Sequence, residues 1–257
     1  RYPIRKKQIS MVQLLTQNNM PKNMIVFDVV ASTMIKGRDM LNAGVARPFA
    51  VVANQQTAGY GKFGRQFFSP RGSGVYMTFV FDVPTGGFDA GLLTTGVAAT
   101  IARVIFEVTG IQVAMKWVND LYYQDRKIAG ILAEGILTAG QLTQVSIGVG
   151  LNILATVVPP ELRDKIGSLD VDVDKNRLVR QIFTALQADF AGYQQGQHLA
   201  YYQAHAYLTG RYVSVQVGQT VITGKIVGVG QRGELLLVDD SGSSHALLSG
   251  EVTKVNF

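Results

Sequence analysis

A glycine-rich segment with two cations is the first part of this sequence that could bind a charged ligand. The segment GYGKFGR begins at Gly59 and carries Lys62 and Arg65. Glycines let a backbone approach an anion closely, and the exposed N–H groups bind the anion together with nearby cations. The segment therefore predicts a site for a phosphate or a carboxylate. A solvent-exposed loop with incidental charges has the same composition, so the segment alone leaves both interpretations open.

The same segment formally matches the G-x-G-x-x-G pattern of nucleotide-binding loops. A dinucleotide fingerprint requires a helix directly after the glycines, but the residues that follow, RQFFSPRGSG, cannot open a helix. A kinase glycine loop requires H-R-D and D-F-G motifs further along the chain, and the sequence contains neither. Both of these interpretations are therefore excluded.

Two further segments carry polar residues at places where strands are expected to end. The first is KWVND, residues 116–120, which is followed by KIAGILAE from Lys127 to Glu134. Lys127 begins an otherwise apolar strand, and a lysine that merely extends to water is the plain alternative there. The second is GVGLNI, residues 148–153, with a glycine turn and one amide side chain. Each segment alone is typical of ordinary turns and strand ends.

These residues need a scaffold, and the apolar periodicity predicts one that mixes helices and strands. Apolar residues at positions 93, 97, 101, 104 and 108 recur with helical spacing and predict a buried amphipathic helix. Ser32 stands where an N-cap would open a short helix that ends near Gly44. We expect strands at 24–30, 49–55, 75–83, 113–117, 127–136 and 142–149, and further helices at 178–193 and 199–208.

The pattern changes near residues 208–211. From Tyr212 on, short alternating strands separated by glycine-rich turns are typical of a small β-barrel. We therefore divide the chain into an N-terminal segment over residues 1–23, a main domain over 24–208 and a barrel over 209–257.

The composition excludes several classes of protein. Of the 257 residues 47% are apolar and none is Cys, which fits a globular protein with a sizeable core and excludes disulfides, thiolate metal sites and a cysteine nucleophile. The three histidines are scattered, so neither a zinc site nor a Ser-His-Asp triad is expected. No uncharged apolar run approaches the roughly 18 residues of a membrane span, and the basic N-terminus lacks the apolar stretch of a secretory signal. We expect a cytoplasmic protein without a membrane partner.

The positive charge is concentrated in the first part of the chain. Residues 1–71 carry 11 Lys and Arg against 2 Asp and Glu, a net charge of +9, whereas residues 72–257 carry 13 against 16. This distribution fits either a nucleic-acid-binding module or one site for a small anion. The barrel has 4 basic and 4 acidic residues, and the basic excess coincides with the glycine-rich segment. Both observations favour the small anion, so nucleic acid is not expected as a partner.

Taken together and in this order, the segments resemble the biotin–protein ligases. The resemblance is carried by Ser32-Thr33 after a strand, by QQTAGYGKFGRQFFSP, by GVGLNI and, most specifically, by KWVNDLYYQDRKIAGILAE. It covers about residues 24–155, and the terminal GQRGELLLV and SGEV resemble the small C-terminal domain of that family. The resemblance implies an α+β fold, in which a mixed-sheet catalytic domain of the biotin/lipoate ligase type precedes a small C-terminal SH3-like β-barrel.

Members of that family activate biotin with Mg-ATP to biotinyl-5′-AMP and pass the biotinyl group to a lysine of a carrier domain. The resemblance therefore implies biotin as substrate, ATP and Mg²⁺, and as partner a biotin carboxyl carrier protein or the carrier domain of a carboxylase. A carboxylate that attacks a phosphate brings two anions together, so cations and N–H donors must surround both. Lys62, Arg65, Lys127 and the glycine backbone can supply them. A homodimer and the identity of metal-binding residues are left open.

By motif position, the resemblance assigns roles to individual residues. Lys127, Lys62 and Asp120 are the expected catalytic residues, and Asp120 would orient the acceptor lysine. Arg65 would meet phosphate, and Phe67 would stack on adenine. The expected biotin-binding residues are Ser32, Thr33, Gln56, Gly59, Tyr60, Gly61, Lys62, Lys127, Gly130 and Gly148. The expected ATP-binding residues are Arg65, Phe67, Asn119, Lys127 and Asn152.

The sequence departs from the family pattern at five of these positions or beside them, one of which, Val118 in place of a usual Pro, is expected to be harmless. Where GRGRxGR is usual, Tyr60 and Lys62 replace two arginines. Because Lys is a point charge and Arg a planar fork, the grip on the adenylate is expected to differ. Met34 replaces an Asn, and Phe67 replaces a Trp but can still stack. A biotin-binding homologue with weak turnover therefore stays an alternative, as does a lipoate–protein ligase, which shares the fold.

Two expectations concern the flanks of the site. Residues 1–23 are too short for the helix-turn-helix that some family members carry. If nothing was removed upstream, we expect a ligase without repressor activity. Residues 60–68 are expected to be mobile without ligand, because glycines and unpaired cations leave little to hold them.

Overall fold

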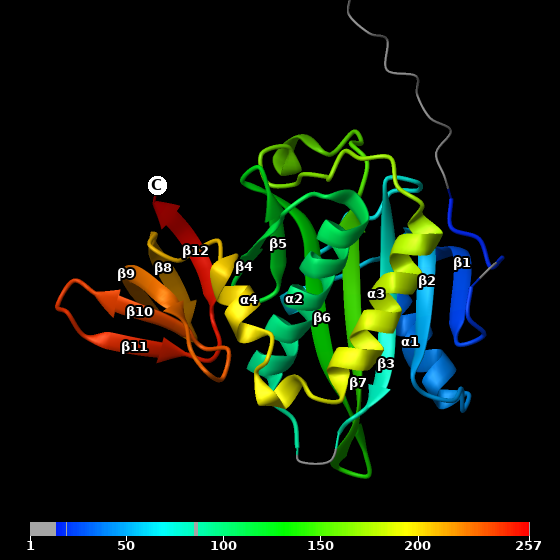
Figure 1. The fold of residues 1–257 in the computed structure, drawn as a ribbon, viewed down its shortest axis with the longest axis horizontal. Helices are drawn as coiled ribbons and strands as arrows, with labels where there is room; N and C mark the ends of the chain where they lie inside the picture. The colour runs from blue at the N-terminus through cyan, green and yellow to red at the C-terminus, as the bar shows by residue number, and fades with distance from the viewer. Residues whose placement is uncertain (1–13, 19, 85–86, 257) are drawn as a thin grey trace, which may run out of the picture.

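A seven-stranded mixed sheet forms the centre of the protein (Figure 1). The structure, a computed structural model, describes residues 14–18, 20–84 and 87–256. β1 and β2 run parallel, and every other neighbouring pair in this sheet is antiparallel. In spatial order the strands are β1 (Met24–Val30), β2 (Phe49–Gln56), β3 (Gly74–Asp82), β7 (Gln141–Asn152), β6 (Arg126–Thr138), β5 (Asp120–Tyr123) and β4 (Ala114–Lys116).

Helices pack on both faces of this sheet. On one face, Phe79 of β3 stacks on Phe183 of α3 with 5.6 Å between the ring centroids. The side chain of the preceding residue, Thr78, points to the other face, because successive residues of a strand alternate. There it contacts α1 at Gly37, where an added Cβ would lie 3.1 Å from Thr78 Cγ2. The helices are α1 (Thr33–Asn42), α2 (Ala90–Thr109), α3 (Lys175–Phe190) and α4 (Leu199–Ala204), with 3₁₀ turns η1 (Lys62–Gly64), η2 (Pro160–Leu162) and η3 (Tyr193–Gln195).

Helix α2 is a core helix whose composition would also suit a membrane. Among the described residues it is the one helix long and apolar enough to cross a bilayer, with a mean hydropathy of 1.5. Inside this protein 72% of that apolar stretch is buried, and the helix lies in front of β4, β5 and β6 in Figure 1. Asp89 caps its start by accepting from Leu92 N at 2.9 Å, and Gly110 ends it with a left-handed φ of 71°. Burial against the sheet accounts for the apolar composition.

Five antiparallel strands form a second, smaller sheet at the C-terminal end (Figure 1). Its inward side chains, such as Val213, Ile226 and Leu237, are buried and join the same hydrophobic core as the main sheet. This is the arrangement that the alternating pattern after Tyr212 predicts for an SH3-like barrel. In spatial order the strands are β11 (Ser244–Leu247), β10 (Leu235–Asp239), β9 (Thr220–Val229), β8 (Tyr212–Val217) and β12 (Glu251–Asn256).

The strands and helices expected from the sequence are confirmed, with two omissions and one shorter helix. Strand β5 (DLYY) and strand β12 (EVTKVN) were not predicted, because both are short and lack the apolar alternation that marks the other strands. α4 ends at Ala204 rather than near 208, because the residues that follow it form a β-bridge with Met115 of β4. Met115 N donates to His205 O, and Met115 O accepts from Tyr207 N.

The division of the chain into segments stays a prediction. Of the N-terminal segment 1–23, residues 1–13 and 19 lie outside the described residues, so the expectation about a helix-turn-helix lies there too. The boundary near 208–211 falls between the end of α4 and the start of β8.

The barrel is held against the main sheet at a tight turn. Trp117 Nε1 donates to Gly233 O at 2.9 Å, and the Trp117 side chain is buried. A Cβ on Gly91 would lie 2.5 Å from Arg232 O, so a side chain there would prevent this approach of α2 to the turn. Asp89 and Arg232 form an ion pair at 3.6 Å across the same junction. The one tryptophan of the sequence thus couples the KWVND segment to the barrel.

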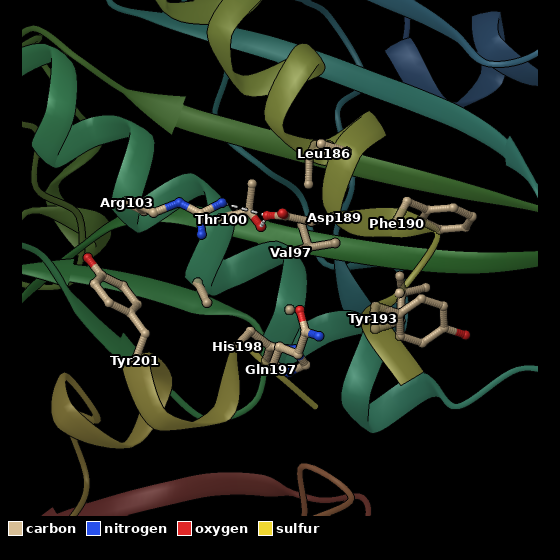
Figure 2. Close-up of a pocket in the computed structure, with 15 residues that line it drawn as sticks. Val97, Thr100, Arg103, Leu186, Asp189, Phe190, Tyr193, Gln197, His198 and Tyr201 are labelled. Atoms are coloured by element: carbon tan, nitrogen blue, oxygen red, sulfur yellow. Dashed lines mark hydrogen bonds and ion pairs between the residues drawn. The ribbon is translucent and has the colours of Figure 1, made fainter. Parts of the chain in front are cut away.

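A cleft of about 340 Å³ opens between α2, α3 and the start of α4 (Figure 2). Figure 2 shows Asp189 pointing to Thr100 and Arg103, and its carboxylate accepts from Thr100 Oγ1 at 2.5 Å and from Arg103 Nη2 at 2.6 Å. Thr95 Oγ1 donates to a carbonyl of its own helix, so His198 Nε2 donates to Thr95 Oγ1 at 2.9 Å. None of the residues predicted to bind biotin or ATP lines this cleft.

His198 should make the stability of this helical layer depend on pH. Burial lowers the pKa of the His198 imidazole, and the Asp189 carboxylate opposes this more weakly. The unfolded chain therefore binds a proton on this residue at a higher pH than the folded chain does. The free energy of unfolding should fall as the pH drops below about 6.5, the pKa of a free histidine.

Urea unfolding of the whole protein between about pH 7.5 and pH 5 measures this effect. His198→Gln removes the titrating group and should make the fall in the free energy of unfolding shallower. An equally steep fall in the variant would contradict this role of His198.

Candidate active site

Glycines of two adjacent strands form a floor on which the side chain of Phe67 lies. Gly130 of β6 pairs with Gly150 of β7. A Cβ on Gly150 would lie 2.2 Å from the Phe67 ring, and a Cβ on Gly130 would lie 3.2 Å from both that ring and Lys127 Nζ. Glycine at these two positions lets an aromatic ring and an ammonium group reach the strand backbone. Phe67 of the glycine-rich segment is thus brought together with Lys127 and Gly130, which both come from the KIAGILAE segment.

A chain of hydrogen bonds joins α1, two strands and the glycine-rich loop. Thr78 Oγ1 donates to Thr33 Oγ1 at 2.9 Å, and Thr33 Oγ1 donates to Gln56 Oε1 at 3.0 Å. Gln56 Nε2 donates to Ser69 Oγ at 3.0 Å, and Ser69 Oγ donates to Phe67 O at 2.9 Å. These hydrogen bonds fix the backbone of Phe67, and with it the base of its side chain, relative to the sheet. Thr33 and Gln56 therefore position the loop whether or not they also touch a ligand.

Ser32 and Met34 shape the site at the start of α1. Both side chains are buried, and Ser32 Oγ accepts from Met34 N at 3.2 Å, which confirms the predicted helix cap. A Cβ on Gly148 would lie 2.8 Å from Met34 Sδ. Gly148, predicted to permit close approach to biotin, therefore also makes room for Met34. The replacement of Asn by Met thus changes a surface of this site directly.

The glycine-rich loop is a tight hairpin. Tyr60 and Gln66 form a β-bridge, and Gly61 N donates to Arg65 O at 2.8 Å. Tyr60 Oη donates to Glu134 Oε2 of β6 at 3.4 Å. Gly59, at the base of the hairpin, has no room for a side chain, because a Cβ there would lie 2.6 Å from Gln56 Nε2. Tyr60, which replaces an arginine of the family pattern, thus attaches the loop to the sheet through a carboxylate.

Two lysines and one carboxylate lie together between β4, β5 and β6. Lys127 Nζ and Asp120 Oδ1 form an ion pair at 2.7 Å, which joins two of the predicted catalytic residues. Lys116 Nζ donates to Tyr122 Oη at 3.2 Å. Burial lowers the pKa of Lys116, and the Asp120 carboxylate opposes this shift. Asp120 is therefore the local anion that balances both lysines.

The two cations of the loop are bonded to the barrel. Arg65 donates to both carboxylate oxygens of Glu251 at 2.5 and 2.7 Å, and Lys62 Nζ donates to Gly250 O at 3.3 Å. The premise that the loop holds unpaired cations is therefore wrong. The partner lies 186 residues further along the chain, so no local pattern could have indicated it.

A larger cleft of about 770 Å³ adjoins the loop, a volume within the usual range of small-molecule sites. Asn152 lines it, and Asn152 Nδ2 donates to Gly167 O at 3.1 Å. Phe68 lines it as well, so the cleft begins beside the Phe67 floor. Its wall carries charges of both signs, because Asp164 and Asp170 line it together with Arg126 and Arg163. None of these four charged residues was predicted from the sequence, because three lie outside the motifs and Arg126 lies between KWVND and KIAGILAE, the two parts to which roles were assigned.

Asn119 is hydrogen-bonded to the backbone of β6 through both its side chain and its own carbonyl. Asn119 Nδ2 donates to Ile131 O at 2.8 Å, and Ile131 N donates to Asn119 O at 2.8 Å. This leaves Oδ1 as the side-chain atom that can face a ligand or an ion. Within the described part of the chain, no three His, Cys, Asp or Glu residues gather to hold a metal ion. Such a donor set fits Mg²⁺ that is held mainly by phosphate oxygens and water.

Comparisons with known proteins agree on one family. Residues 26–152 match the model of the Biotin/lipoate A/B protein ligase family. Over 242 residues the chain is 30% identical to a biotin–[acetyl-CoA-carboxylase] ligase of Mycobacterium tuberculosis, covering 88% of this chain and 87% of that relative. Over 211 residues it is 29% identical to the bifunctional ligase/repressor BirA of Escherichia coli, covering 79% of this chain but only 65% of that relative.

Comparison of the fold with solved structures identifies the same family. The structure is similar to that of a biotin protein ligase from Aquifex aeolicus in complex with biotin and ATP, with a TM-score of 0.78 and 26% sequence identity. The similarity covers 90% of this chain and 98% of that chain.

Gly150→Ala tests the floor. The added Cβ would lie 2.2 Å from the Phe67 ring, and overpacking of this kind costs about 1–3 kcal/mol. We expect the ring to leave the floor and ligand binding at the site to weaken about tenfold or more, as measured by calorimetric titration with biotin.

Gly192→Ala is the matched control, because a Cβ there would make only ordinary contacts at 3.6 Å or more. It should bind biotin as the unchanged protein does. Unaltered binding by Gly150→Ala would show that the position of Phe67 does not matter.

Proposed function

The chain belongs to the biotin protein ligase family, and from this premise we propose that it activates biotin with ATP and transfers the biotinyl group to a lysine of a carboxylase carrier domain. The observation that carries the proposal is the convergence of Phe67 and Lys127 over the Gly130–Gly150 floor, beside a cleft large enough for a nucleotide.

In the first step, a carboxylate oxygen of biotin attacks the α-phosphorus of ATP. A new P–O bond forms, the bond from the α-phosphorus to the α,β-bridging oxygen breaks, and pyrophosphate leaves with the electron pair. The step transfers no proton and yields biotinyl-5′-AMP. Two anions must meet in it, so cations held in place before the reaction supply most of the stabilisation. Lys127, whose ammonium group lies at the Gly130 backbone, would take this role, and Arg65 and Lys62 of the glycine-rich loop would supply further positive charge.

In the second step, the amine of the acceptor lysine attacks the acyl carbon of the mixed anhydride. The C–O bond to AMP breaks, AMP leaves with the electron pair, and the attacking nitrogen loses a proton. Asp120 would orient the acceptor lysine and take this proton, and its ion pair with Lys127 at 2.7 Å supports this role. Phe67 and the loop would shield the anhydride from water.

Mg²⁺ is expected to enter with ATP, where it would bind phosphate oxygens and neutralise the charge of pyrophosphate as it leaves. Asn119 Oδ1 and Asn152 would contact this ion or the nucleotide. A cytoplasmic location and the absence of nucleic acid as a partner stay predictions, and a homodimer stays open.

Acyl-adenylate formation tests the substrate. The protein is incubated with ATP, Mg²⁺ and either biotin or lipoate, and the acyl-adenylate is measured by mass spectrometry. We expect biotinyl-5′-AMP and no lipoyl-5′-AMP. Formation of the lipoyl product alone would assign the chain to the lipoate ligases, and formation of neither would exclude the proposed activity.

Lys127→Ala tests the cation at the floor. Removal of one preorganised donor typically lowers a rate by about 10²–10³-fold, so adenylate formation in a single-turnover assay should fall by about that factor. Lys127→Arg should restore only part of the rate, because the guanidinium is larger and spreads its charge.

Lys225→Ala removes an exposed strand lysine of the barrel and serves as the control. It should form the adenylate at the unchanged rate. A normal rate in Lys127→Ala would mean that Lys127 only extends to water.

A further inference from the structure

Glu251, the first residue of β12, is a barrel carboxylate that faces the cations of the candidate active site. Its two oxygens accept from Arg65 at 2.5 and 2.7 Å, and Lys62 Nζ reaches the neighbouring Gly250 O at 3.3 Å. Hydrogen bonds from Arg65 hold the pKa of Glu251 below its ordinary value, and the charges of Lys62 and Lys116 act in the same direction, while burial opposes them. The Glu251 carboxylate is thus attracted electrostatically to three cations, Arg65, Lys62 and Lys116.

The geometry at Glu251 is one that a phosphate group can also adopt. A guanidinium fork binds a carboxylate or a phosphate with the same pair of parallel hydrogen bonds. The side chain of Arg65 is 63% exposed and that of Glu251 is 35% exposed, so an incoming anion can reach the pair from solvent. The local cations are Arg65, Lys62, Lys116 and Lys127, and the carboxylates among them are Glu251 and Asp120. Four positive charges around two negative ones leave a positive excess, which suits a ligand with more than one charge.

The loop side of this contact is the side that can move. A Cβ on Gly250 would lie 2.9 Å from Val215 Cγ1 and 3.0 Å from Gln216 O, so the start of β12 is packed tightly against β8. Arg65, by contrast, follows the short turn η1 of the hairpin and contacts the barrel through its side chain end. Arg65 can therefore change partner while Glu251 stays in place.

We propose that Glu251 is a positioning residue that occupies the phosphate-binding cations of the loop until the phosphates of ATP displace it. The inference rests on the proposed function, because it takes ATP to be the ligand. In the ligand-free protein the pair holds the loop in its hairpin and balances its charge. When ATP binds, Arg65 exchanges the Glu251 carboxylate for phosphate oxygens, and the free energy of the lost ion pair is subtracted from that of ATP binding.

Glu251→Gln tests the exchange, since the amide keeps the shape of the side chain and loses the charge. An ion pair that is open to solvent changes an equilibrium by about two- to fivefold. The KM for ATP in biotinyl-adenylate formation should therefore fall by about that factor, and a residue that merely supported the fold would instead raise it. Trypsin, which cleaves after Lys62 and Arg65, should cut the ligand-free variant faster than the unchanged protein.

Two further proteins make the test specific. Glu107→Gln removes the same charge from the exposed side of α2, where Glu107 faces Arg103 at 4.0 Å, and it should leave the KM for ATP unchanged. In an Arg65→Ala background, Glu251→Gln should no longer change the KM, because the partner is gone.

The outcomes separate this inference from the proposed function. If the unchanged protein forms the adenylate and Glu251→Gln leaves the KM for ATP unchanged or raises it, the exchange is excluded and the proposed function stands. If the unchanged protein forms no adenylate, the proposed function itself fails and the exchange fails with it.

Discussion

Cations gathered to bind two anions repel one another until those anions arrive, and this constraint governs the structure around the site. The chain meets it with its own carboxylates. Asp120 balances Lys127 at 2.7 Å, and Glu251 binds Arg65 through both oxygens. Lys116 is half-buried, and burial holds its pKa below the ordinary value. Strand β5 carries Asp120 and strand β12 carries Glu251, so each of these strands brings one anion to the cations of another segment.

The second requirement is close approach of the ligands to the backbone, and the main sheet provides it. Gly130 and Gly150 lie opposite each other on β6 and β7 and leave a floor without side chains, over which Phe67 lies. The hydrogen-bond chain through Thr33 and Gln56 fixes the loop that carries this ring. The barrel completes the site from the other side, held by the bond from Trp117 to Gly233 and by Glu251. A carboxylate and a triphosphate would then meet between a rigid floor and a loop that exchanges partners.

Much of the fold could be predicted from local patterns, and the rest could not, for physical reasons. Strand β1 begins and ends where its apolar run does, and Ser32 caps α1 as its residue type and place indicate. Strands β5 and β12 escaped prediction because pairing with neighbours, rather than an apolar pattern of their own, makes them strands. The contact between Arg65 and Glu251 spans 186 residues, and it reverses the expectation of a loop without partners. The local sequence identifies which cations can bind an anionic ligand. It does not show which carboxylates of the same chain pair with those cations when the ligand is absent.

Biotin-dependent exchange of labelled pyrophosphate into ATP reports the reversible first step without a carrier protein. We expect the protein with Mg-ATP and labelled pyrophosphate to form labelled ATP when biotin is present and to form none when biotin is left out. Exchange that needs no biotin would show that the cations act on another reaction. No exchange in the presence of biotin would contradict the claim that these cations bring the biotin carboxylate and the α-phosphate of ATP together.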